Sequence, residues 1–493
     1  MTTNPILNTD SYKTSHFLQY PPATEQVFSY VEARGGAYEK ALFFGLQAIL
    51  KAEFSRPVTK ADIDEAEEIL VPHGLPFHRT GWELLIDRHG GHLPLEIRAQ
   101  PEGTIAPLRL PMMTVVNTDP DFFWLTSYVE TALLRVWYPI TVATISNGVR
   151  QLIRKHLIAT SDTPDAELPF KLHDFGARGV SSDQSAALGG MAHLTNFQGT
   201  DTLTALVAAR RFYNTPLAGF SIPAAEHSTI TSWERPNEAA AYANMIRQFG
   251  KPGAVFAVVS DSYDLFHAVE HMWGESLRQQ VIDSGATLVV RPDSGDPVEV
   301  VAKTVGLLAE KFGTDTNTKG YRVLKNVRVI QGDGVNPGSI EAILNRLTAE
   351  GFSASNIAFG MGGALLQKCD RDTLQFAYKA SAAKVGGVWR DVYKDPITDA
   401  GKRSKRGLLG LAADNGAFRT VAVRDGDFQP VDGGRNALET VWRNGELLRD
   451  DSLSDFQPVD GGRNALETVW RNGELLRDDS LSDIRARVAA FDA

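Results

Sequence analysis

The chain has 493 residues, of which 43% are hydrophobic and 22% charged, enough apolar material for two or three domains or for one large barrel with additions. Its formal net charge of −10 at pH 7 argues against nucleic acid as a main partner. The single cysteine, Cys369, excludes an intrachain disulfide, and no apolar stretch approaches the ~20 residues of a membrane span, so we expect a cytoplasmic protein without membrane partners.

The N-terminal part, residues 1–140, is expected to form an α+β sheet domain. Strand-like runs at 26–33 and 93–100 are separated by prolines and glycines, which is typical of short strands joined by turns. The first residues lack the basic and apolar regions of a signal peptide, so no secretory leader is expected.

Between residues 141 and 385, short apolar runs that end in polar or glycine-rich loops alternate with helix-like stretches. The stretches 237–249, 298–312 and 339–350 repeat apolar residues at three- and four-residue spacing, as amphipathic helices do. Strands that alternate with helices imply parallel pairing, and six such units favour an irregular, TIM-like α/β barrel. The strand-to-loop junctions are 170–179, 218–227, 254–262, 286–295, 327–334 and 356–363.

These junctions concentrate polar and glycine residues. In a barrel of this kind, the loops that follow the strands lie on one face, where active sites are found. We therefore expect the junctions to share one site, although loops are often polar for no other reason than exposure. The residues concerned are Asp174, Arg178, Glu226, His227, Asp261, Arg291, Asp293, Asp333, Gly362 and Gly363.

The C-terminal segment, residues 386–493, again contains short strands and turns, and we expect it to pack with the N-terminal domain. The predicted fold class is thus α/β, a barrel with an additional α+β sheet domain built from both ends of the chain. Residues 428–455 recur without a difference at 456–483. Two identical copies do not indicate a solenoid, whose repeats normally diverge, so one copy is expected to be redundant to the fold.

Two motifs admit a structural and a functional interpretation. The run HAVEH at 267–271 matches an inverted zinc-protease motif, but no third ligand is evident, and an ordinary helix with two solvated or packing histidines is the simpler interpretation. We therefore predict no metal site there. Neither a Walker-type phosphate loop nor a strand–GxGxxG–helix unit is present, so nucleotide binding of those two kinds is not indicated.

Four loops could bind phosphate. The runs FGMGG at 359–363 and QGDG at 331–334 bring backbone N–H groups close to an anion, although glycine-rich turns are common. In RPDSGDP at 291–297, an arginine and an aspartate two residues apart could hold an anion or ring and a sugar hydroxyl, or could pair with each other across a turn. The loop 394–407 carries five lysines or arginines and could clamp pyrophosphate or be a solvated basic loop.

Taken together, the motifs resemble the nicotinamide phosphoribosyltransferase family. The resemblance implies a type II phosphoribosyltransferase that transfers phosphoribosyl from phosphoribosyl pyrophosphate (PRPP) to the ring nitrogen of nicotinamide, assisted by ATP hydrolysis, in a homodimer with shared active sites. The matching segments stand in order along the chain: TDSYKTSHFLQYPP (9–22), KLHDFGARGVSS (171–182), NFQGTDT (196–202), SIPAAEHSTIT (221–231), VVSDSYD (258–264), RPDSGDP (291–297), VIQGDGV (329–335), AFGMGG (358–363) and YKDPITDAGKRSKRG (393–407).

The resemblance also implies catalytic roles. The histidine of the AAEH motif, His227, would be transiently phosphorylated by ATP, with Glu226 or Asp261 orienting the imidazole. Asp293 would hold the ribose hydroxyls. Mg²⁺ would bind mainly through phosphate oxygens, so no metal cage made by the protein is expected.

The remaining roles concern substrate recognition. Phe175 and the partner subunit's Tyr12 would stack on the nicotinamide ring, and Asp201 would accept a hydrogen bond from its carboxamide. Further substrate-binding residues would be Arg178, Ser221, Arg291, Gly332, Asp333, Gly362, Gly363 and Arg371. The pyrophosphate or ATP phosphates would be neutralised by Arg34, Lys394 and Lys402 of the partner subunit and by Lys379.

Two positions depart from the family pattern: Met361 stands where a smaller residue is expected, and Ala177 stands where an aromatic is usual. Either could alter the shape of the pocket. Two other functions remain open. A nicotinate phosphoribosyltransferase has the same scaffold and ATP coupling, and a catalytically silent relative could serve as a binding or signalling protein.

Overall fold

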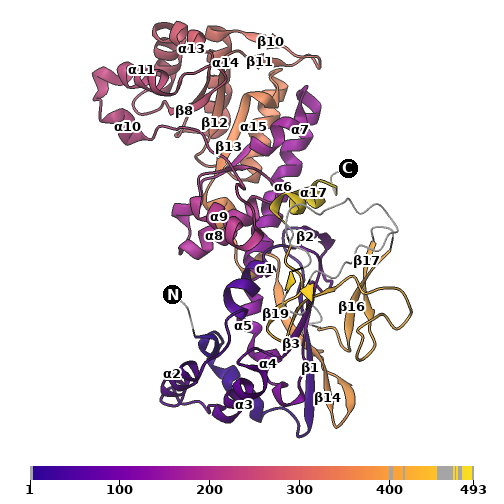
Figure 1. The fold of residues 1–493 in the computed structure, drawn as a ribbon. Coiled ribbons are helices and arrows are strands. Elements are labelled where there is room, and N and C mark those ends of the chain that lie inside the picture. The colour runs from indigo at the N-terminus through magenta and orange to yellow at the C-terminus, as the bar shows by residue number, and fades with distance from the viewer. Residues whose placement is uncertain are drawn as a thin grey trace. The chain divides into compact units, whose positions relative to one another are not determined.

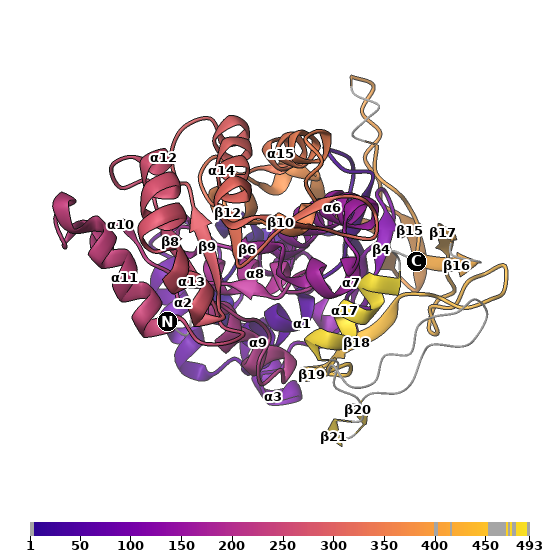
Figure 2. The same cartoon turned by 90° about the horizontal axis from the view of Figure 1, so that it is seen from above.

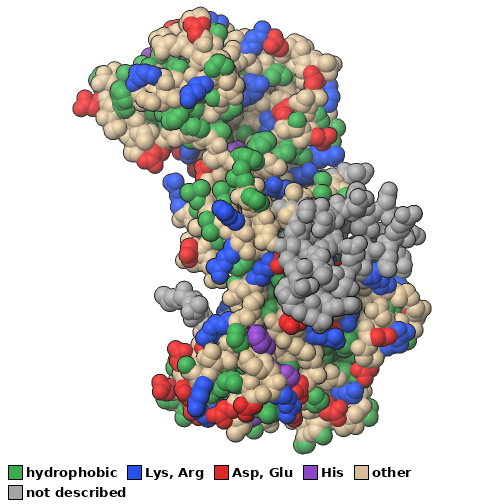
Figure 3. Space-filling view, in the orientation of Figure 1, with side chains coloured by type: hydrophobic (Ala, Val, Ile, Leu, Met, Phe, Trp, Pro, Cys, Tyr) green, Lys and Arg blue, Asp and Glu red, His purple; other side chains and the backbone are tan. Residues whose placement is uncertain are grey.

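The computed structural model describes residues 4–398, 403–414, 417–451, 470–471, 474–475 and 480–490. The chain forms two compact units (Figures 1 and 2). Unit 1 comprises Met1–Thr144, Ala208–Pro216 and Asp370–Ala493, and unit 2 comprises Ile145–Val207 and Leu217–Cys369. On the face drawn in Figure 3, acidic and basic side chains are interspersed. Over the described ranges, no helix has the length and apolar character needed to cross a bilayer.

Unit 2 is built on a parallel sheet of six strands in the order β7-β6-β13-β12-β9-β8, in which every neighbouring pair is parallel. The inner strands are nearly continuous apolar runs, because helices cover such a sheet and leave little of it to solvent. The expected parallel α/β layout is confirmed. The strands are β6 (Leu172–Asp174), β7 (Gly199–Thr200), β8 (Val255–Val259), β9 (Thr287–Arg291), β12 (Val327–Gln331) and β13 (Ile357–Met361).

The predicted junction 218–227 forms no strand of its own. Instead, isolated parallel bridges join Phe220 to Gly199, on one edge strand, and Ala224 to Ala257, on the other. Pro223 lies between the two bridges and has no N–H to donate, which keeps the segment from forming a regular ladder. The same segment therefore contacts both edges of the six-stranded sheet, but eight regular barrel strands are not present among the described residues.

The helices of unit 2 connect successive strands and lie around them in the view of Figure 2. The three helices predicted from periodicity are confirmed as α11, α14 and α15. The last two begin at Pro297 and Pro337, and the side chains of Asp296 and Asn336 accept backbone N–H groups of the first turn. The bounds are α6 (Trp137–Thr160) and α9 (Leu203–Tyr213), which cross between the units, α7 (Pro164–Glu167), α8 (Asp183–His193), α10 (His227–Thr231), α11 (Glu238–Phe249), α12 (Leu265–His267), α13 (Arg278–Ser284), α14 (Pro297–Phe312), α15 (Pro337–Ala349) and α16 (Gly363–Leu366).

Unit 1 contains an antiparallel sheet of seven strands in the order β15-β14-β1-β5-β3-β18-β19. Its three central strands come from the N-terminal part and are flanked on both sides by C-terminal strands, because β14 pairs with β1 and β18 pairs with β3. The expected boundary at residue 385 differs from this arrangement, since β14 belongs to unit 1 through its long ladder with β1. The strands are β1 (Thr24–Ala33), β3 (Leu95–Ala99), β5 (Met113–Asn117), β14 (Phe376–Val385), β15 (Val388–Asp391), β18 (Glu439–Arg443) and β19 (Glu446–Leu447).

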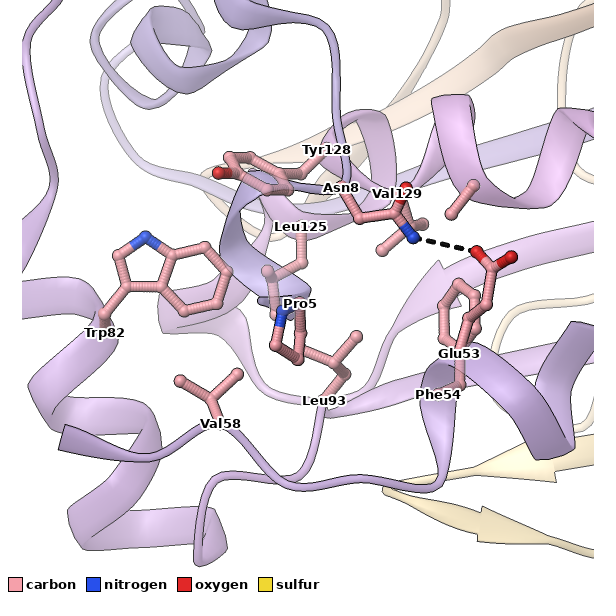
Figure 4. A pocket seen from close by; sticks show the side chains of 11 residues that line it. Pro5, Asn8, Glu53, Phe54, Val58, Trp82, Leu93, Leu125, Tyr128 and Val129 are labelled. Carbon is pink, nitrogen blue, oxygen red and sulfur yellow. Dashed lines mark hydrogen bonds between the residues drawn. The ribbon is translucent and has the colours of Figure 1, made fainter. Parts of the chain in front are cut away.

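One face of this sheet is covered by helices that bury an aromatic cluster around Trp82, Trp124 and Tyr128. The small cavity in Figure 4 lies in this core and has a volume of about 20 Å³, room for about one water and not for a base or a sugar phosphate. Helices of unit 1 are α1 (Leu46–Ile49), α2 (Lys60–Leu70), α3 (Arg79–His89), α4 (Leu125–Tyr128), α5 (Glu130–Leu134) and, outside this aromatic core, α17 (Leu481–Ala490). The small two-stranded sheets are β2 (Lys40–Leu42) with β4 (Ile105–Pro107), β10 (Thr314–Thr316) with β11 (Arg322–Leu324), β16 (Leu409–Asp414) with β17 (Ala417–Ala422), and β20 (Trp470–Arg471) with β21 (Glu474–Leu475).

Candidate active site

The carboxyl ends of the parallel strands in unit 2 supply most of the predicted site residues. Because parallel strands all end at the same edge of the sheet, the loops that follow them are neighbours. Phe175 and Arg178 follow β6, Asp201 follows β7, Asp261 follows β8, Arg291 ends β9, Asp293 follows it, Gly332 and Asp333 follow β12, and Gly362 and Gly363 follow β13.

His227 lies at the start of α10, and its imidazole Nε2 is 3.0 Å from Oδ1 of Asp261. The second oxygen of Asp261 accepts a 2.6 Å hydrogen bond from the hydroxyl of Ser294. The Asp261 side chain is only 5% exposed, whereas the imidazole is 48% exposed. A buried carboxylate thus fixes the orientation of a histidine whose ring is open to a ligand.

Glu226, the other carboxylate predicted to orient the histidine, is placed differently. The hydroxyl of Ser228 donates to its Oε1, and the hydroxyl of Thr229 donates to its backbone oxygen at 2.9 Å. These contacts brace the start of α10, the short helix that begins with His227. The carboxylate that contacts the imidazole is therefore that of Asp261.

The ring of Phe175 packs against the backbone of two glycines, Gly360 and Gly332. A Cβ on Gly360 would come within 1.9 Å of the phenyl ring, and one on Gly332 would lie 3.4 Å from both the ring and Nε of Arg291. Glycine at 360 is therefore required for the ring to pack on β13, because any larger residue would displace it. Beneath the ring, Ala257, Val289 and Ile330 form a small apolar cluster, against which Phe175, Ile222 and Ala358 pack.

Arg291 and Asp293 form a bidentate ion pair in this structure. Nη2 of Arg291 is 2.8 Å from each carboxylate oxygen of Asp293, and the guanidinium lies 5.7 Å from the centroid of Phe175. This is the pairing across a turn that the RPDSGDP motif allowed. It also brings a planar cation, a carboxylate and an aromatic face to one place.

Asp201 and Ser221 face each other, although they are separated in sequence. The hydroxyl of Ser221 donates to Oδ1 of Asp201 at 2.5 Å, and the backbone N–H of Asp201 donates to the carbonyl of Asp174 at 3.0 Å. Both side chains of the pair are exposed, so the carboxylate of Asp201 can also accept a donor from a ligand.

The glycine-rich loops lie beside Phe175. A Cβ on Gly362 would come within 3.3 Å of the Phe175 carbonyl oxygen, whereas Gly363 has open space at that point. Side-chain Nε2 of Gln331 donates to the carbonyl of Asp333 at 2.7 Å and so orders the second loop. Arg178 and Asp333 are exposed at the ends of their loops.

The two departures from the family pattern have different surroundings. Met361 is fully buried in β13, where its carbonyl accepts the N–H of Phe175 at 3.1 Å, so its side chain belongs to the core. Ala177 is exposed in the 3-10 turn Ala177–Gly179.

The predicted phosphate-binding residues lie in unit 1. Burial lowers the pKa of Lys379. The neighbouring cations Arg34, Lys13 and Lys394 lower it too, whereas the carboxylate of Glu130 raises it. Four basic side chains thus act on one another close to Glu130, which pairs with Lys13, and Glu32, which pairs with Arg34. Of these, only Lys13 was not predicted from the sequence; it is nearly buried and lies 2.6 Å from Glu130.

Arg34 is the residue of this group with a buried nitrogen that lacks a hydrogen-bond acceptor among the described residues. Its Nε donates to Glu32 at 3.0 Å, and its Nη2 is buried without a hydrogen-bond partner among the described residues. A buried guanidinium nitrogen without an acceptor is costly, and an anion would relieve that cost. We call Lys13, Arg34, Lys379 and Lys394 the basic cluster of unit 1.

The other predicted residues of unit 1 are more exposed. Tyr12 has 58% of its surface exposed, and Lys13 lies 5.1 Å from its ring centroid. Arg371 is exposed and contacts Asp372 at 3.2 Å. Lys402 lies outside the described residues.

The HAVEH segment forms part of the helical stretch Leu265–Ser276. The rings of His267 and His271 are 4.9 Å apart, and His271 pairs with Glu275 at 3.0 Å. Over the described part of the chain, no group of three or more His, Cys, Asp or Glu residues is arranged to hold a metal ion.

Comparison with known proteins identifies the family of the chain. The nicotinate phosphoribosyltransferase (NAPRTase) family matches residues 170–436, and the nicotinamide phosphoribosyltransferase N-terminal domain matches residues 4–97. A nicotinamide phosphoribosyltransferase from Xanthomonas campestris pv. campestris (strain 8004) is 60% identical over 457 residues, which cover 91% of this chain and 96% of that protein. The chain belongs to the nicotinamide phosphoribosyltransferase family.

More distant members of the nicotinamide phosphoribosyltransferase family and solved structures extend the comparison. A relative from Acinetobacter baylyi (strain ATCC 33305 / BD413 / ADP1) is 33% identical over 489 residues, covering 91% of this chain and 95% of that protein. The crystal structure of nicotinate-nucleotide pyrophosphorylase from Pyrococcus furiosus superposes with a TM-score of 0.59 at 15% identity, covering 99% and 96% of the two chains. That of human nicotinic acid phosphoribosyltransferase gives 0.54 at 20%, covering 98% and 93%. The two structures show a shared α/β fold.

Proposed function

We propose that this chain transfers phosphoribosyl from PRPP to nicotinamide, forming nicotinamide mononucleotide (NMN) and pyrophosphate, and that ATP hydrolysis assists the reaction through a phosphohistidine at His227. The observation that carries the proposal is the chain of contacts Ser294–Asp261–His227 at the same sheet edge as Phe175 and Arg291. A phosphorylatable imidazole and a flat aromatic platform share one set of loops.

The phosphoryl step needs an oriented and exposed imidazole. With Nε2 held by Asp261, the second ring nitrogen attacks the γ-phosphorus of ATP, the bond to the bridging oxygen breaks, and ADP leaves. The carboxylate stabilises the positive charge that develops on the ring, as in other oriented histidines. Water later cleaves the P–N bond and returns the free imidazole and inorganic phosphate.

The transfer step needs positioning more than a protein nucleophile. The ring nitrogen of nicotinamide bonds to C1 of the ribose as the bond from C1 to pyrophosphate breaks, so the ribose passes through a cationic state. Phe175 supplies a face for the ring, and Asp201 accepts from the carboxamide. Asp293 holds the ribose hydroxyls once ligands separate it from Arg291, while Arg291 turns to the base.

The basic cluster of unit 1 suits the leaving group. Pyrophosphate carries several negative charges, and Arg34 has a buried nitrogen that lacks an acceptor. Mg²⁺, when bound, neutralises phosphate charge, and it would be held mainly through phosphate oxygens rather than by a protein cage. We assign Arg34, Lys13 and Lys379 to the phosphate oxygens that the ion leaves free.

Three further features belong to the same proposal. Tyr12, Arg34, Lys394 and Lys402 act on the active site of a partner chain, which makes the enzyme a homodimer. The bridges from segment 220–225 to both edge strands support closure of the parallel sheet into an irregular barrel. A cytoplasmic location is supported by the presence of a single cysteine, which cannot form a disulfide within the chain.

A two-base turnover assay tests the proposal. Purified protein with Mg²⁺ and PRPP, with and without ATP, should form NMN from nicotinamide faster than it forms the acid product from nicotinate. Asp201→Asn should lower this preference by about tenfold or more, because one hydrogen bond to a charged acceptor is lost and repulsion of the nicotinate carboxylate ends. Asp315→Asn, in the remote hairpin β10–β11, is the matched control.

Preference of the wild-type protein for nicotinate would assign the chain to the nicotinate-specific reaction. Absence of any product from either base would favour a binding or signalling role.

A further inference from the structure

Asp174 is a buried acidic residue that is hydrogen-bonded both to the Phe175 loop and to Asp201, the two parts of the chain proposed to bind the base. It ends β6 and has no exposed surface. Its Oδ1 accepts the backbone N–H of Gly176 at 2.7 Å, directly after Phe175, and its carbonyl accepts the N–H of Asp201 at 3.0 Å. Its Oδ2 is buried without a hydrogen-bond partner among the described residues.

The surroundings of Asp174 explain why this carboxyl group is unusual. Burial, the largest cause, and the charge of Asp201 together raise the pKa of Asp174 to about 6, against the opposing effect of the nearby Thr202 and Thr200 hydroxyls and of the Gly176 N–H. Gly190 of α8 lies beside it, since a Cβ there would lie 3.1 Å from Oδ2 of Asp174. Among the described residues, the charge that acts on Asp174 is that of Asp201.

We propose that Asp174 is a positioning residue for nicotinamide recognition, which holds the Phe175 loop and Asp201 in one fixed arrangement. This inference rests on the proposed function. Its side chain fixes the loop that presents the aromatic face, and its backbone fixes the residue that accepts from the carboxamide. Loss of the side-chain bond therefore loosens the base pocket, whereas the loop of Gly332 and Asp333 keeps its own bond from Gln331 to the Asp333 carbonyl.

The test compares Asp174→Ala and Asp174→Asn with the wild-type protein. We expect Asp174→Ala to raise KM for nicotinamide by about tenfold, which is one hydrogen bond, and to change KM for PRPP by less than about twofold. In the wild type, KM for nicotinamide should fall as the pH rises through about 6, because the ionised carboxylate holds Gly176 more tightly. Asp174→Asn should abolish this step while keeping an oxygen acceptor.

Equal changes in both KM values, an unchanged KM for nicotinamide, or a pH step that survives in Asp174→Asn would overturn the proposal. Turnover of nicotinamide by the wild type tests the proposed function separately, so the two failures are distinguishable.

A second observation, independent of the first, concerns the identical copies 428–455 and 456–483. The hairpin β18–β19 pairs Trp442 with Leu447, and the hairpin β20–β21 pairs Trp470 with Leu475, which are the same residues of the two copies. The first hairpin joins the seven-stranded sheet through β3, whereas the second forms a two-stranded sheet by itself.

The contacts that one repeat makes in unit 1 are supplied partly by the first copy and partly by the second. From the first copy, Trp442 is fully buried against Phe54, and the N–H of Asp451 donates to Gln47 at 2.6 Å. From the second copy, the N–H of Leu481 donates to Thr215 at 3.1 Å, where α17 begins. Joined end to end, 428–451 and 480–483 read as one complete repeat, FQPVDGGRNALETVWRNGELLRDDSLSD, so the 28 residues between them are a surplus of one repeat length.

We infer that the two hairpins compete for the same place beside β3. Because the copies are identical, the contacts with β3, Phe54 and Gln47 are the same whichever copy supplies them. The two arrangements differ only in whether the surplus follows the seated hairpin or precedes it, and the entropy of closing a loop depends weakly on such a change. Trp442 and Trp470 are therefore interchangeable, and the sheet edge is occupied by either copy.

Four variants test this competition in thermal unfolding. Trp442→Ala and Trp470→Ala alone should each lower the melting temperature by less than about 2 °C, because the unchanged copy takes the place. The double variant should lower it by roughly 10 °C, the cost of truncating a buried tryptophan. Deletion of one repeat yields the same chain whichever copy is removed, and there the remaining tryptophan should show the full loss when changed to alanine.

A loss in Trp442→Ala or in Trp470→Ala alone that equals the loss in the double variant would overturn the inference, because one copy alone would then occupy the sheet. The single-repeat chain is the control, since changing its tryptophan to alanine measures how much that residue contributes to the melting temperature when no second copy exists.

Discussion

The parallel sheet of unit 2 and the antiparallel sheet of unit 1 place their functional side chains by different means. In unit 2, most of the predicted residues lie at or just after the end of a strand, and the parallel order brings these ends to one edge. Ser221, Glu226 and His227 are the exception, because segment 218–227 forms only isolated bridges to the two edge strands. In unit 1, the basic cluster is assembled from a 3-10 turn, the end of β1, the middle of β14 and a loop beyond β15. A strand end is marked in the sequence by a short motif, whereas such a cluster depends on pairings between distant segments.

This difference explains which residues could be predicted. The motifs in unit 2 mark both a strand end and the polar residue after it, so sequence pattern and position agree. Lys13 and Glu130 are 117 positions apart, and neither has a motif of its own that indicates the contact. Their pairing follows from the packing of α5 against the N-terminal turn, which periodicity does not determine.

The largest effect should come from breaking the contact between His227 and Asp261. We expect His227→Asn to lower the ATP-dependent turnover by on the order of 10²–10⁴-fold, since no other imidazole contacts Asp261 among the described residues. Mass spectrometry after exposure to ATP should show a phosphorylated wild-type peptide and none in the variant. His271→Asn, an exposed histidine that pairs with Glu275, is the matched control, and a label that persists in His227→Asn would place the phosphoryl group elsewhere.

The next effect concerns the basic cluster of unit 1. Arg34→Gln should raise KM for PRPP by about 10- to 100-fold, because a charged hydrogen-bond donor is worth about 1.5–3 kcal/mol. KM for nicotinamide should change little, since Phe175 and Asp201, which are proposed to bind its ring and carboxamide, belong to unit 2. Initial rates with each substrate varied in turn measure the two constants.

Lys384→Gln is the matched control for the cluster, because this lysine lies on β14 like Lys379 but pairs with Asp425. An equal rise of KM for PRPP in Lys384→Gln would show that general charge, not the cluster, attracts the substrate.

A pH effect should separate Lys379 from ordinary lysines. Burial and neighbouring cations lower its pKa, so it loses its charge at a lower pH than an exposed lysine does. Affinity for pyrophosphate should therefore weaken as the pH rises into the alkaline range, and Lys379→Arg should remove that weakening because arginine stays charged. Product inhibition by pyrophosphate, measured from pH 7 to about 10, follows the change; an identical profile in Lys379→Arg would assign the alkaline limb to another group.

The copies 428–455 and 456–483 mark another limit of prediction. Their identity is plain from the sequence, and one copy was expected to be redundant, yet no pattern indicates that the folded unit takes residues from both. That result depends on where Asp451 and Leu481 find partners, on Gln47 and Thr215. Packing determines contacts between residues so far apart in sequence. Because the two copies are identical, their own sequence does not determine which of them makes these contacts.

The smallest effect tests whether the two units unfold separately. Thr59 caps α2 in unit 1 and Asn336 caps α15 in unit 2, each through a side-chain oxygen that accepts backbone N–H groups. Either change to alanine should cost about 1 kcal/mol, because one or two N–H groups of the first turn lose their acceptor. Two compact units with their own cores favour two transitions, so in urea each change should shift only the transition of its own unit. Replacing Trp233 and Trp273 by phenylalanine makes fluorescence report on unit 1 alone, because all the other tryptophans belong to that unit, and comparison with the unchanged chain gives the signal of unit 2. A shift of both signals by one change would mean that the two sheets, although built by different means, unfold as a single cooperative structure.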